Sequence, residues 1–147
     1  MTTASASSPG GPQRVLIAED EFLVYLALEE DLRVNGFAIV GPFTTLAETR
    51  DAVGRERIDF ALLDINLGGE MIFPVADELI ARKIPFLFLS GYSSAAIPDG
   101  YRKFPRFEKP YDPARLMAAL RQLSEEKHPL PGTDPHTGPD GLELPAA

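Results

Sequence analysis

Several apolar runs in this sequence end on a side chain that can do chemistry. Glu19 and Asp20 follow one run, Asp64 follows a second, Ser90 ends a third and Lys109 ends a fourth. A charge is costly to bury, so each of these groups should lie where water, an ion or a partner can reach it. Their joint chemistry depends on whether the fold brings them to one place.

Together these groups would form an acidic site with one ammonium and one hydroxyl. Carboxylates within a few ångströms of one another repel, and one is forced to protonate unless a cation intervenes. Mg²⁺ is a hard cation that binds a few carboxylates together with waters and phosphate oxygens. Lys109 offers a point charge suited to phosphate, and Ser90 can donate to a phosphoryl oxygen. Asp64, at the centre, is the candidate nucleophile for aspartyl-phosphate chemistry.

The elements that must position these groups alternate between strands and helices. The expected strands are five short apolar runs at residues 14–18, 37–41, 60–63, 85–90 and 104–109. Helical patterns run from Phe22 to an Asn-Gly stop and over residues 44–55, 74–83 and 112–127. This alternation predicts an α/β fold, a doubly wound five-stranded parallel sheet with helices on both faces. The carboxyl ends of such strands lie at one edge, where the polar residues should converge.

Local patterns indicate where the helices begin and which residues they bring together. Phe22, Leu23 and Leu26 recur at helix spacing in the first helix, and Thr44 or Thr45 is the expected N-cap of the second.

The connection between residues 91 and 103 should hold only a short or irregular fourth helix, because Pro98 and an Asp-Gly turn interrupt it. The clearest helix follows, with Asp112 as its N-cap and Pro113 in its first turn.

Composition favours one globular domain with polar ends. The chain has 147 residues, a formal net charge of −8 and no cysteine, so disulfides and thiolate metal sites are excluded. Residues 1–12 and 128–147 are rich in Pro, Gly and small polar residues and are expected to be disordered, which leaves a domain at residues 13–127. The two histidines, His128 and His136, both fall in the second of these segments.

The same features argue against several classes of function. The acidic balance disfavours nucleic-acid binding, which usually needs a basic face. No apolar stretch approaches the length of a membrane span, and the start of the chain does not resemble a secretory signal, so a cytoplasmic location is expected. A P-loop NTPase is excluded because no G-x-x-x-x-G-K motif occurs.

Four motifs in order, VLIAEDE, LLDINL, FLSGY and EKPYDP, resemble those of the receiver domain of two-component response regulators. The resemblance covers roughly residues 13–127, and each motif falls at the end of an expected strand. It implies a CheY-like, flavodoxin-like sheet with strand order 2-1-3-4-5.

The resemblance also assigns roles to the acidic residues. Glu19 and Asp20 match the acidic pair that holds Mg²⁺, and Asp64 matches the phosphoacceptor, which also contacts the metal. Asn66 matches the position whose backbone carbonyl completes the metal shell.

Further positions match the part of a receiver that responds to phosphorylation. Ser90 matches the switch hydroxyl and Lys109 the phosphate-contacting lysine, and the peptide bond before Pro110 is implied to be cis. Arg106 stands where typical receivers have a switch aromatic.

PFLFLSGY partly matches the motif of the FAT GUY subgroup, Pro-Phe-x-Phe-Ala-Thr-Gly-Tyr, which also lacks that aromatic. Tyr92 is then the candidate for the aromatic that senses the switch.

The expected function is that of a stand-alone receiver in a phosphorelay, with Mg²⁺ as its cofactor. A sensor histidine kinase or histidine phosphotransferase would supply the phosphoryl group to Asp64, and a downstream protein would respond. Apart from accepting and losing this group the protein is not expected to be an enzyme, and homodimerisation is left open.

Two other functions are weighed against this one. A pseudo-receiver would act as an interaction module without phosphorylation, although every core site position is filled here. A phosphatase of the haloacid-dehalogenase type also uses an aspartyl phosphate and Mg²⁺, but it needs a second Asp where this chain has Asn66, and it needs its motif on the first strand.

Simpler structural interpretations exist for each site residue. Glu21 is best explained as a first-turn acid at the start of a helix. Asp64 could cap the turn that follows it, Ser90 could be a turn residue and Lys109 a solvated surface lysine. The joint occurrence of all four motifs favours the functional interpretation.

Overall fold

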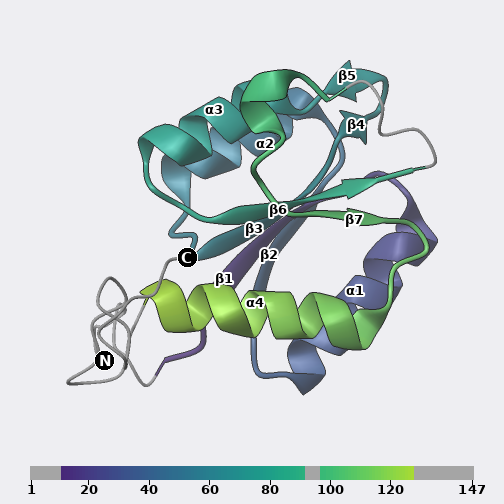
Figure 1. Ribbon diagram of the computed structural model, residues 1–147, viewed down its shortest axis with the longest axis vertical. Coiled ribbons are helices and arrows are strands. Elements are labelled where there is room, and N and C mark those ends of the chain that lie inside the picture. Colours follow the sequence, from purple (N-terminus) through teal and green to yellow (C-terminus); the bar gives the residue numbers. More distant parts are fainter. Residues whose placement is uncertain (1–10, 92–96, 128–147) are drawn as a thin grey trace. The chain divides into compact units, whose positions relative to one another are not determined.

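The computed structural model describes residues 11–91 and 97–127, and its main element is a five-stranded parallel sheet (Figure 1). The strand order is β2-β1-β3-β6-β7, which is 2-1-3-4-5 when these five strands are numbered along the chain. The strands are β1 (Arg14–Ala18), β2 (Ala38–Phe43), β3 (Phe60–Asp64), β6 (Phe86–Ser90) and β7 (Arg106–Glu108). The predicted doubly wound, CheY-like fold class is confirmed.

Helices cover both sides of this sheet. α1 (Phe22–Val34) lies on one side, and α2 (Leu46–Arg55) and α3 (Phe73–Ala81) lie on the other (Figure 1). The chain divides into two compact units after Pro113, and the second unit contains nearly all of α4 (Pro113–Lys127). As predicted, α4 begins with Pro113 in its first turn, where proline's missing N–H costs no hydrogen bond.

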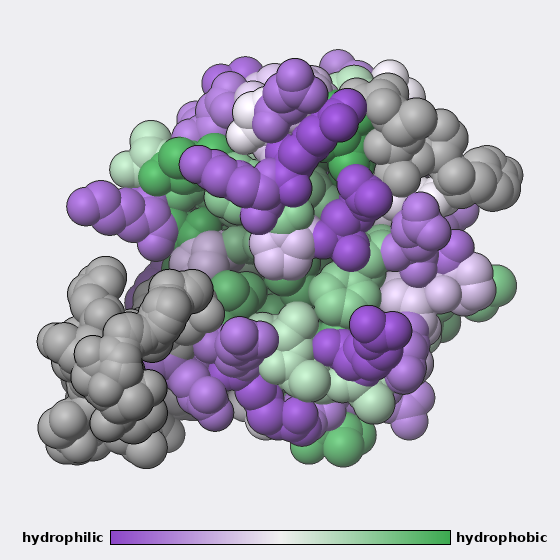
Figure 2. Space-filling model, in the orientation of Figure 1, coloured by the Kyte–Doolittle hydropathy of each residue, from purple (hydrophilic) through white to green (hydrophobic). Residues whose placement is uncertain are grey.

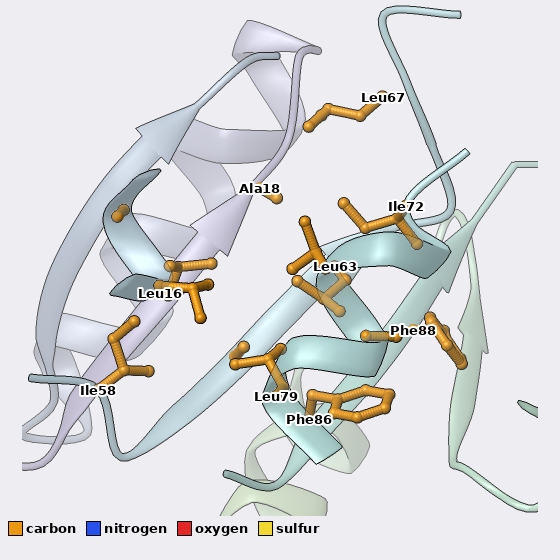
Figure 3. Close-up of a cluster of buried hydrophobic side chains, with 14 of the residues drawn as sticks. Leu16, Ala18, Ile58, Leu63, Leu67, Ile72, Leu79, Phe86 and Phe88 are labelled. Carbon is orange, nitrogen blue, oxygen red and sulfur yellow. The ribbon is translucent and has the colours of Figure 1, made fainter. Parts of the chain in front are cut away.

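The central strands are apolar on both faces because both faces are covered. β3 and β6 are buried along their whole length and pair in parallel, with Asp64 opposite Leu89. Side chains such as Leu63, Phe88 and Ile72 form a cluster between β3, β6 and α3 (Figure 3). Full burial of a side chain of this size contributes about 1.5–3 kcal/mol. This packing holds the carboxyl ends of β3 and β6 in place.

α1 buries a different set of residues from those whose spacing indicated it. Its buried residues are Tyr25, Leu28 and Leu32. Phe22 and Leu23 are 70% and 77% exposed. The helix carries apolar residues on more than one face, so spacing alone located the helix without identifying its inner side.

Two hydrogen bonds that involve Glu48 fix the start of α2. The Glu48 N–H donates to Thr45 Oγ1 at 3.1 Å, and the Thr44 N–H donates to Glu48 Oε1 at 3.3 Å. This is a variant of the capping box in which Glu48 reaches one residue beyond the N-cap, and the N-cap is Thr45 rather than Thr44.

A small hairpin that was not predicted follows β3. β4 (Asn66–Leu67) and β5 (Glu70–Met71) pair antiparallel. They are joined by Gly68 and Gly69, whose φ angles are +61° and +92°. A two-residue turn with positive φ at both positions suits glycine, because side chains clash with the backbone there.

The helical element between β6 and β7 is short within the described residues, as expected. Its described part contains only a three-residue 3₁₀ helix, η1 (Asp99–Tyr101). Tyr101 stacks on Phe73 with ring centroids 4.6 Å apart, and its hydroxyl donates to Asp77 Oδ1 at 2.6 Å. These contacts anchor η1 to α3. Tyr92, the candidate switch aromatic, lies outside the described residues.

The face shown in Figure 2 is mixed, with hydrophilic side chains prominent over α3 and hydrophobic patches between them. Within residues 11–91 and 97–127, none of the helices combines the length and the apolar character required to cross a bilayer.

Gly41 in β2 is a position at which even alanine should not fit. Its φ is +127°, and an added Cβ would lie 2.8 Å from the carbonyl oxygen of Ile17 in β1. Gly41→Ala should therefore lower the free energy of unfolding by about 2–4 kcal/mol, through backbone strain and overpacking. Urea denaturation provides the measurement.

Gly36→Ala is the matched control, because Gly36 also has a positive φ of +88° but open space around it. Its cost should be only about 1–2 kcal/mol of strain. Equal losses for the two variants would show that the contact with β1 is unimportant.

Candidate functional site

Three carboxylates meet where β1 and β3 end. Glu19 and Asp20 follow β1, Asp64 ends β3, and carboxylate oxygens from all three lie within 4.8 Å of one another. Glu19 and Asp64 are buried, being 1% and 5% exposed, whereas Asp20 is exposed. Adjacent parallel strands in register bring these residues together, since Ala18 pairs with Leu63. The predicted convergence is present.

The ammonium of Lys109 lies among these carboxylates. Lys109 Nζ is 2.9 Å from Glu19 Oε1, 3.2 Å from Asp64 Oδ2 and 3.0 Å from Glu21 Oε1. The backbone N–H of Lys109 donates to the Ser90 carbonyl oxygen at 2.8 Å, which ties the end of β7 to that of β6. Lys109 is thus an internal cation of the site rather than a solvated surface lysine.

Burial and charge shift the pKa values of both partners. Burial, and then the negative charge of Glu19, raise the pKa of Asp64 to about 7, although Lys109 opposes the shift. Burial acts to lower the pKa of Lys109, but hydrogen bonds to Glu19 and Glu21 and the charge of Asp64 outweigh it and raise that pKa. Even with Lys109 in place, the site therefore favours an additional proton or cation at Asp64.

The β4–β5 hairpin also contributes to the site. The Gly68 N–H donates to Asp20 Oδ2 at 3.0 Å, and the Gly69 N–H donates to Asn66 Oδ1 at 2.9 Å. The first of these bonds positions Asp20 across 48 residues of sequence. The side chain of Asn66 is engaged in its own turn, and the metal-binding role of its backbone carbonyl stays a prediction.

Two buried hydroxyls near the site have no hydrogen-bond partner among the described residues. They are Ser90 Oγ, at the end of β6, and the Tyr111 hydroxyl. Burial, and then the charges of Asp31 and Glu19, raise the pKa of Tyr111. An unpaired buried hydroxyl is unfavourable, so the Ser90 hydroxyl is available for an incoming acceptor.

Two sequence-based expectations near β7 can be placed directly. The Lys109–Pro110 peptide bond is cis, as expected. Arg106, at the position where typical receivers have an aromatic residue, is exposed on β7.

Glu21 lies one residue before the helix turn in which the sequence predicted it. It was expected in the first turn of a helix, but α1 begins at Phe22, and Glu21 is the N-cap residue without a side-chain capping bond. Its carboxylate contacts Lys109 instead. Tyr111 was not singled out at all, and only its position within EKPYDP could have suggested a contribution.

The donor set suits a hard divalent cation. Glu19, Asp20 and Asp64 supply only carboxylate oxygens, the ligand type that Mg²⁺ and Ca²⁺ prefer. Burial, and then the charge of Glu19, raise the pKa of Asp64, and a bound cation would favour the charged carboxylate against both effects. The residues present therefore fit a Mg²⁺ site.

The chain shows similarity to a known regulatory protein. No protein-family model matches it. It is similar to the transcriptional regulatory protein PdtaR of Mycobacterium tuberculosis, with 28% identity over 113 residues. That match covers 74% of this chain and 55% of PdtaR, so the chain spans about half the length of this relative.

Among solved structures, the chain is similar to SdrG from Sphingomonas melonis Fr1. The identity is 38%, the TM-score is 0.69, and the match covers 77% of this chain and 97% of SdrG. The BeF3-activated conformation of SdrG from Pseudomonas melonis Fr1 gives 36% identity and a TM-score of 0.65, covering 78% of this chain and 98% of that one.

More distant structures share the fold. A CheY-like response regulator receiver domain protein from Methanospirillum hungatei JF-1 has a TM-score of 0.71 at 20% identity, covering 80% of this chain and 98% of its own. The receiver domain of sensor histidine kinase PA1611 from Pseudomonas aeruginosa PAO1, solved with a magnesium ion in its active site cleft, has a TM-score of 0.63 at 22% identity. That match covers 77% of this chain and 98% of the PA1611 domain.

Asp64→Asn should change how stability depends on pH. Because the folded protein raises the pKa of Asp64 from 3.8 to about 7, this carboxyl stabilises the fold below pH 3.8, and that stabilisation is lost as pH rises through about 7. The free energy of unfolding of the variant, relative to that of wild type, should therefore increase by on the order of 2–4 kcal/mol between about pH 5 and pH 8. Chemical denaturation at a series of pH values measures this.

Asp51→Asn is the control, because it removes a carboxylate that is 71% exposed and distant in sequence from the site. A parallel pH profile for wild type and Asp64→Asn would contradict the raised pKa.

Proposed function

This chain belongs to the CheY-like receiver domains of response regulators in two-component signalling, and we propose that Asp64 is the residue that accepts its phosphoryl group. One observation carries the proposal. Asp64 is a buried carboxylate at the end of a central strand, and it lies beside two further carboxylates and an ammonium. This arrangement provides a nucleophile, a cation site and a charge that can pair with phosphate.

The proposed reaction is a phosphoryl transfer from a phosphohistidine donor. An oxygen of the Asp64 carboxylate forms the new P–O bond while the donor's P–N bond breaks, and the donor imidazole leaves with the bonding electrons and takes up a proton. The product is an aspartyl phosphate. Burial of Asp64 excludes water from most approaches to the acceptor oxygen.

A divalent metal ion would be held by Glu19, Asp20 and Asp64, with the backbone carbonyl of Asn66 as a further proposed ligand. When bound, Mg²⁺ would neutralise charge on the carboxylates and on the transferring phosphoryl oxygens. The magnesium ion in the PA1611 receiver domain supports this choice of metal. The Asp20–Gly68 hydrogen bond keeps one of these ligands in place.

The switch that follows would use Ser90 and Lys109. An aspartyl phosphate adds negative charge and strong acceptor oxygens. Ser90 has a buried hydroxyl ready to donate, and Lys109 already contacts Asp64. Reversing a two-state equilibrium from about 1:99 to 99:1 needs about 5.5 kcal/mol of differential interaction. New charge-assisted hydrogen bonds at these two residues would supply part of it.

Receiver domains interact with histidine kinases and with downstream partners. We propose that a kinase or histidine phosphotransferase in the cytoplasm supplies the phosphoryl group to this chain. A protein partner, which could be a second copy of the chain, would then bind the phosphorylated form. The chain would have no enzymatic activity beyond accepting and losing the group. PFLFLSGY and the exposed Arg106 support membership of the FAT GUY subgroup, with Tyr92 as the switch aromatic.

The first test is Mg²⁺-dependent modification by acetyl phosphate. Wild type should gain an acid-stable, base-labile phosphoryl group, seen as a mobility shift on a phosphate-binding gel. Asp64→Asn should gain none, because a neutral amide has replaced the carboxylate that acts as nucleophile.

Equal modification of Asp64→Asn would move the phosphoacceptor elsewhere. If no small-molecule or phosphohistidine donor modified the wild type, a pseudo-receiver would be favoured. Steady hydrolysis of phosphate esters would favour a phosphatase.

A second test concerns the metal ligands. Mg²⁺ should raise the thermal midpoint of the wild type by mass action. Asp20→Asn removes a charged ligand and should increase the Mg²⁺ concentration needed for half of this effect about tenfold or more, since tenfold corresponds to about 1.4 kcal/mol.

Asp99→Asn is a suitable control because its side chain is 95% exposed and lies in η1. The metal assignment would be wrong if Asp20→Asn and Asp99→Asn responded alike to Mg²⁺.

A further inference from the structure

Glu21 is the one acidic partner of Lys109 that lies outside the candidate metal site. Of the three carboxylates that contact Lys109 Nζ, those of Glu19 and Asp64 also belong to the cluster suited to a cation. Glu21 does not belong to that cluster, and within the described part of the chain its carboxylate pairs with Lys109, at 3.0 Å. Its carboxylate is therefore not needed to bind the metal.

The backbone holds Glu21 in the position to make this contact. The Glu21 N–H donates to Glu19 Oε2 at 2.9 Å, and α1 begins at the next residue. The side chain of Lys109 is only 13% exposed and contacts three carboxylates. The contact thus joins two well-placed groups, although the Glu21 side chain itself is 61% exposed.

Three carboxylates are enough to occupy the amine completely. A lysine ammonium has three N–H donors, and here three acidic side chains lie within hydrogen-bond distance of it. A phosphoryl oxygen on Asp64 would be a new acceptor for the same ammonium. A bound cation would neutralise Glu19 and Asp64 in place of Lys109, but Glu21 would continue to attract the Lys109 ammonium.

We infer that Glu21 competes with the phosphoryl group for Lys109 and so restrains phosphorylation of the site. This inference rests on the proposed function of Asp64 as phosphoacceptor. Glu21 is a positioning residue in this account, because it acts on the phosphoryl group through Lys109. Removing its charge should release the ammonium and strengthen binding of a phosphoryl-like anion at Asp64.

The test measures the affinity of the full chain for beryllofluoride at saturating Mg²⁺, by NMR titration. Beryllofluoride is a suitable probe because SdrG has a BeF3-activated conformation. Glu21→Gln should bind it about two- to fivefold more tightly, the range expected for a partly exposed ion pair. Glu30→Gln makes the same change of charge at an exposed position of α1 and should leave the affinity unchanged.

Glu21→Asp separates the contact from the local charge. Aspartate keeps the negative charge but its carboxylate reaches one methylene less far, so this variant should also bind more tightly than wild type. Unchanged or weaker binding by Glu21→Gln, or wild-type affinity in Glu21→Asp, would overturn the inference while leaving the proposed function intact. Binding that is absent in wild type, or equal in Asp64→Asn, would overturn the proposed function and this inference with it.

Discussion

Repulsion among carboxylates at the ends of β1 and β3 is the constraint on which the rest of this site depends. Glu19, Asp20 and Asp64 are too close for all of them to be charged without compensation, and two of the three are buried. The ammonium of Lys109 offsets part of that charge, yet burial first and the charge of Glu19 second still raise the pKa of Asp64. An acidic site that is only partly neutralised suits a divalent cation, and the charge of that cation would also offset the negative charge that a phosphoryl group would add.

The fold supplies this arrangement through ordinary packing. Parallel strands end at the same edge of a sheet, so burying β3 and β6 places Asp64 beside the residues that follow β1. The main-chain bond from Lys109 to Ser90 then sets the end of β7 against β6. The β4–β5 hairpin adds the bond that holds Asp20. Each of these contacts is local. Together they bring four side chains, those of Glu19, Asp20, Asp64 and Lys109, around one point.

Much of this could be predicted from the sequence, because apolar runs ending in charged residues leave few alternatives in an α/β fold. The sequence alone is enough to assign Asp64 and Lys109 to one edge of the sheet. The inner face of α1 could not be predicted. The exposed residues Phe22 and Leu23 fit the helix spacing just as closely as the buried residues do. Two-residue strands carry no periodicity, so the β4–β5 hairpin was also missed. The contact of Glu21 depends on a lysine 88 positions away, which local pattern cannot show.

The central claim is that Asp64, and no other carboxylate of the cluster, forms the phosphoryl bond. The most direct measurement is to treat the full chain with acetyl phosphate and Mg²⁺, trap the acyl phosphate by borohydride reduction, and locate the reduced residue by mass spectrometry of peptides. The account predicts a single modified residue, Asp64. Modification of Glu19 or Asp20 with Asp64 unchanged would contradict it.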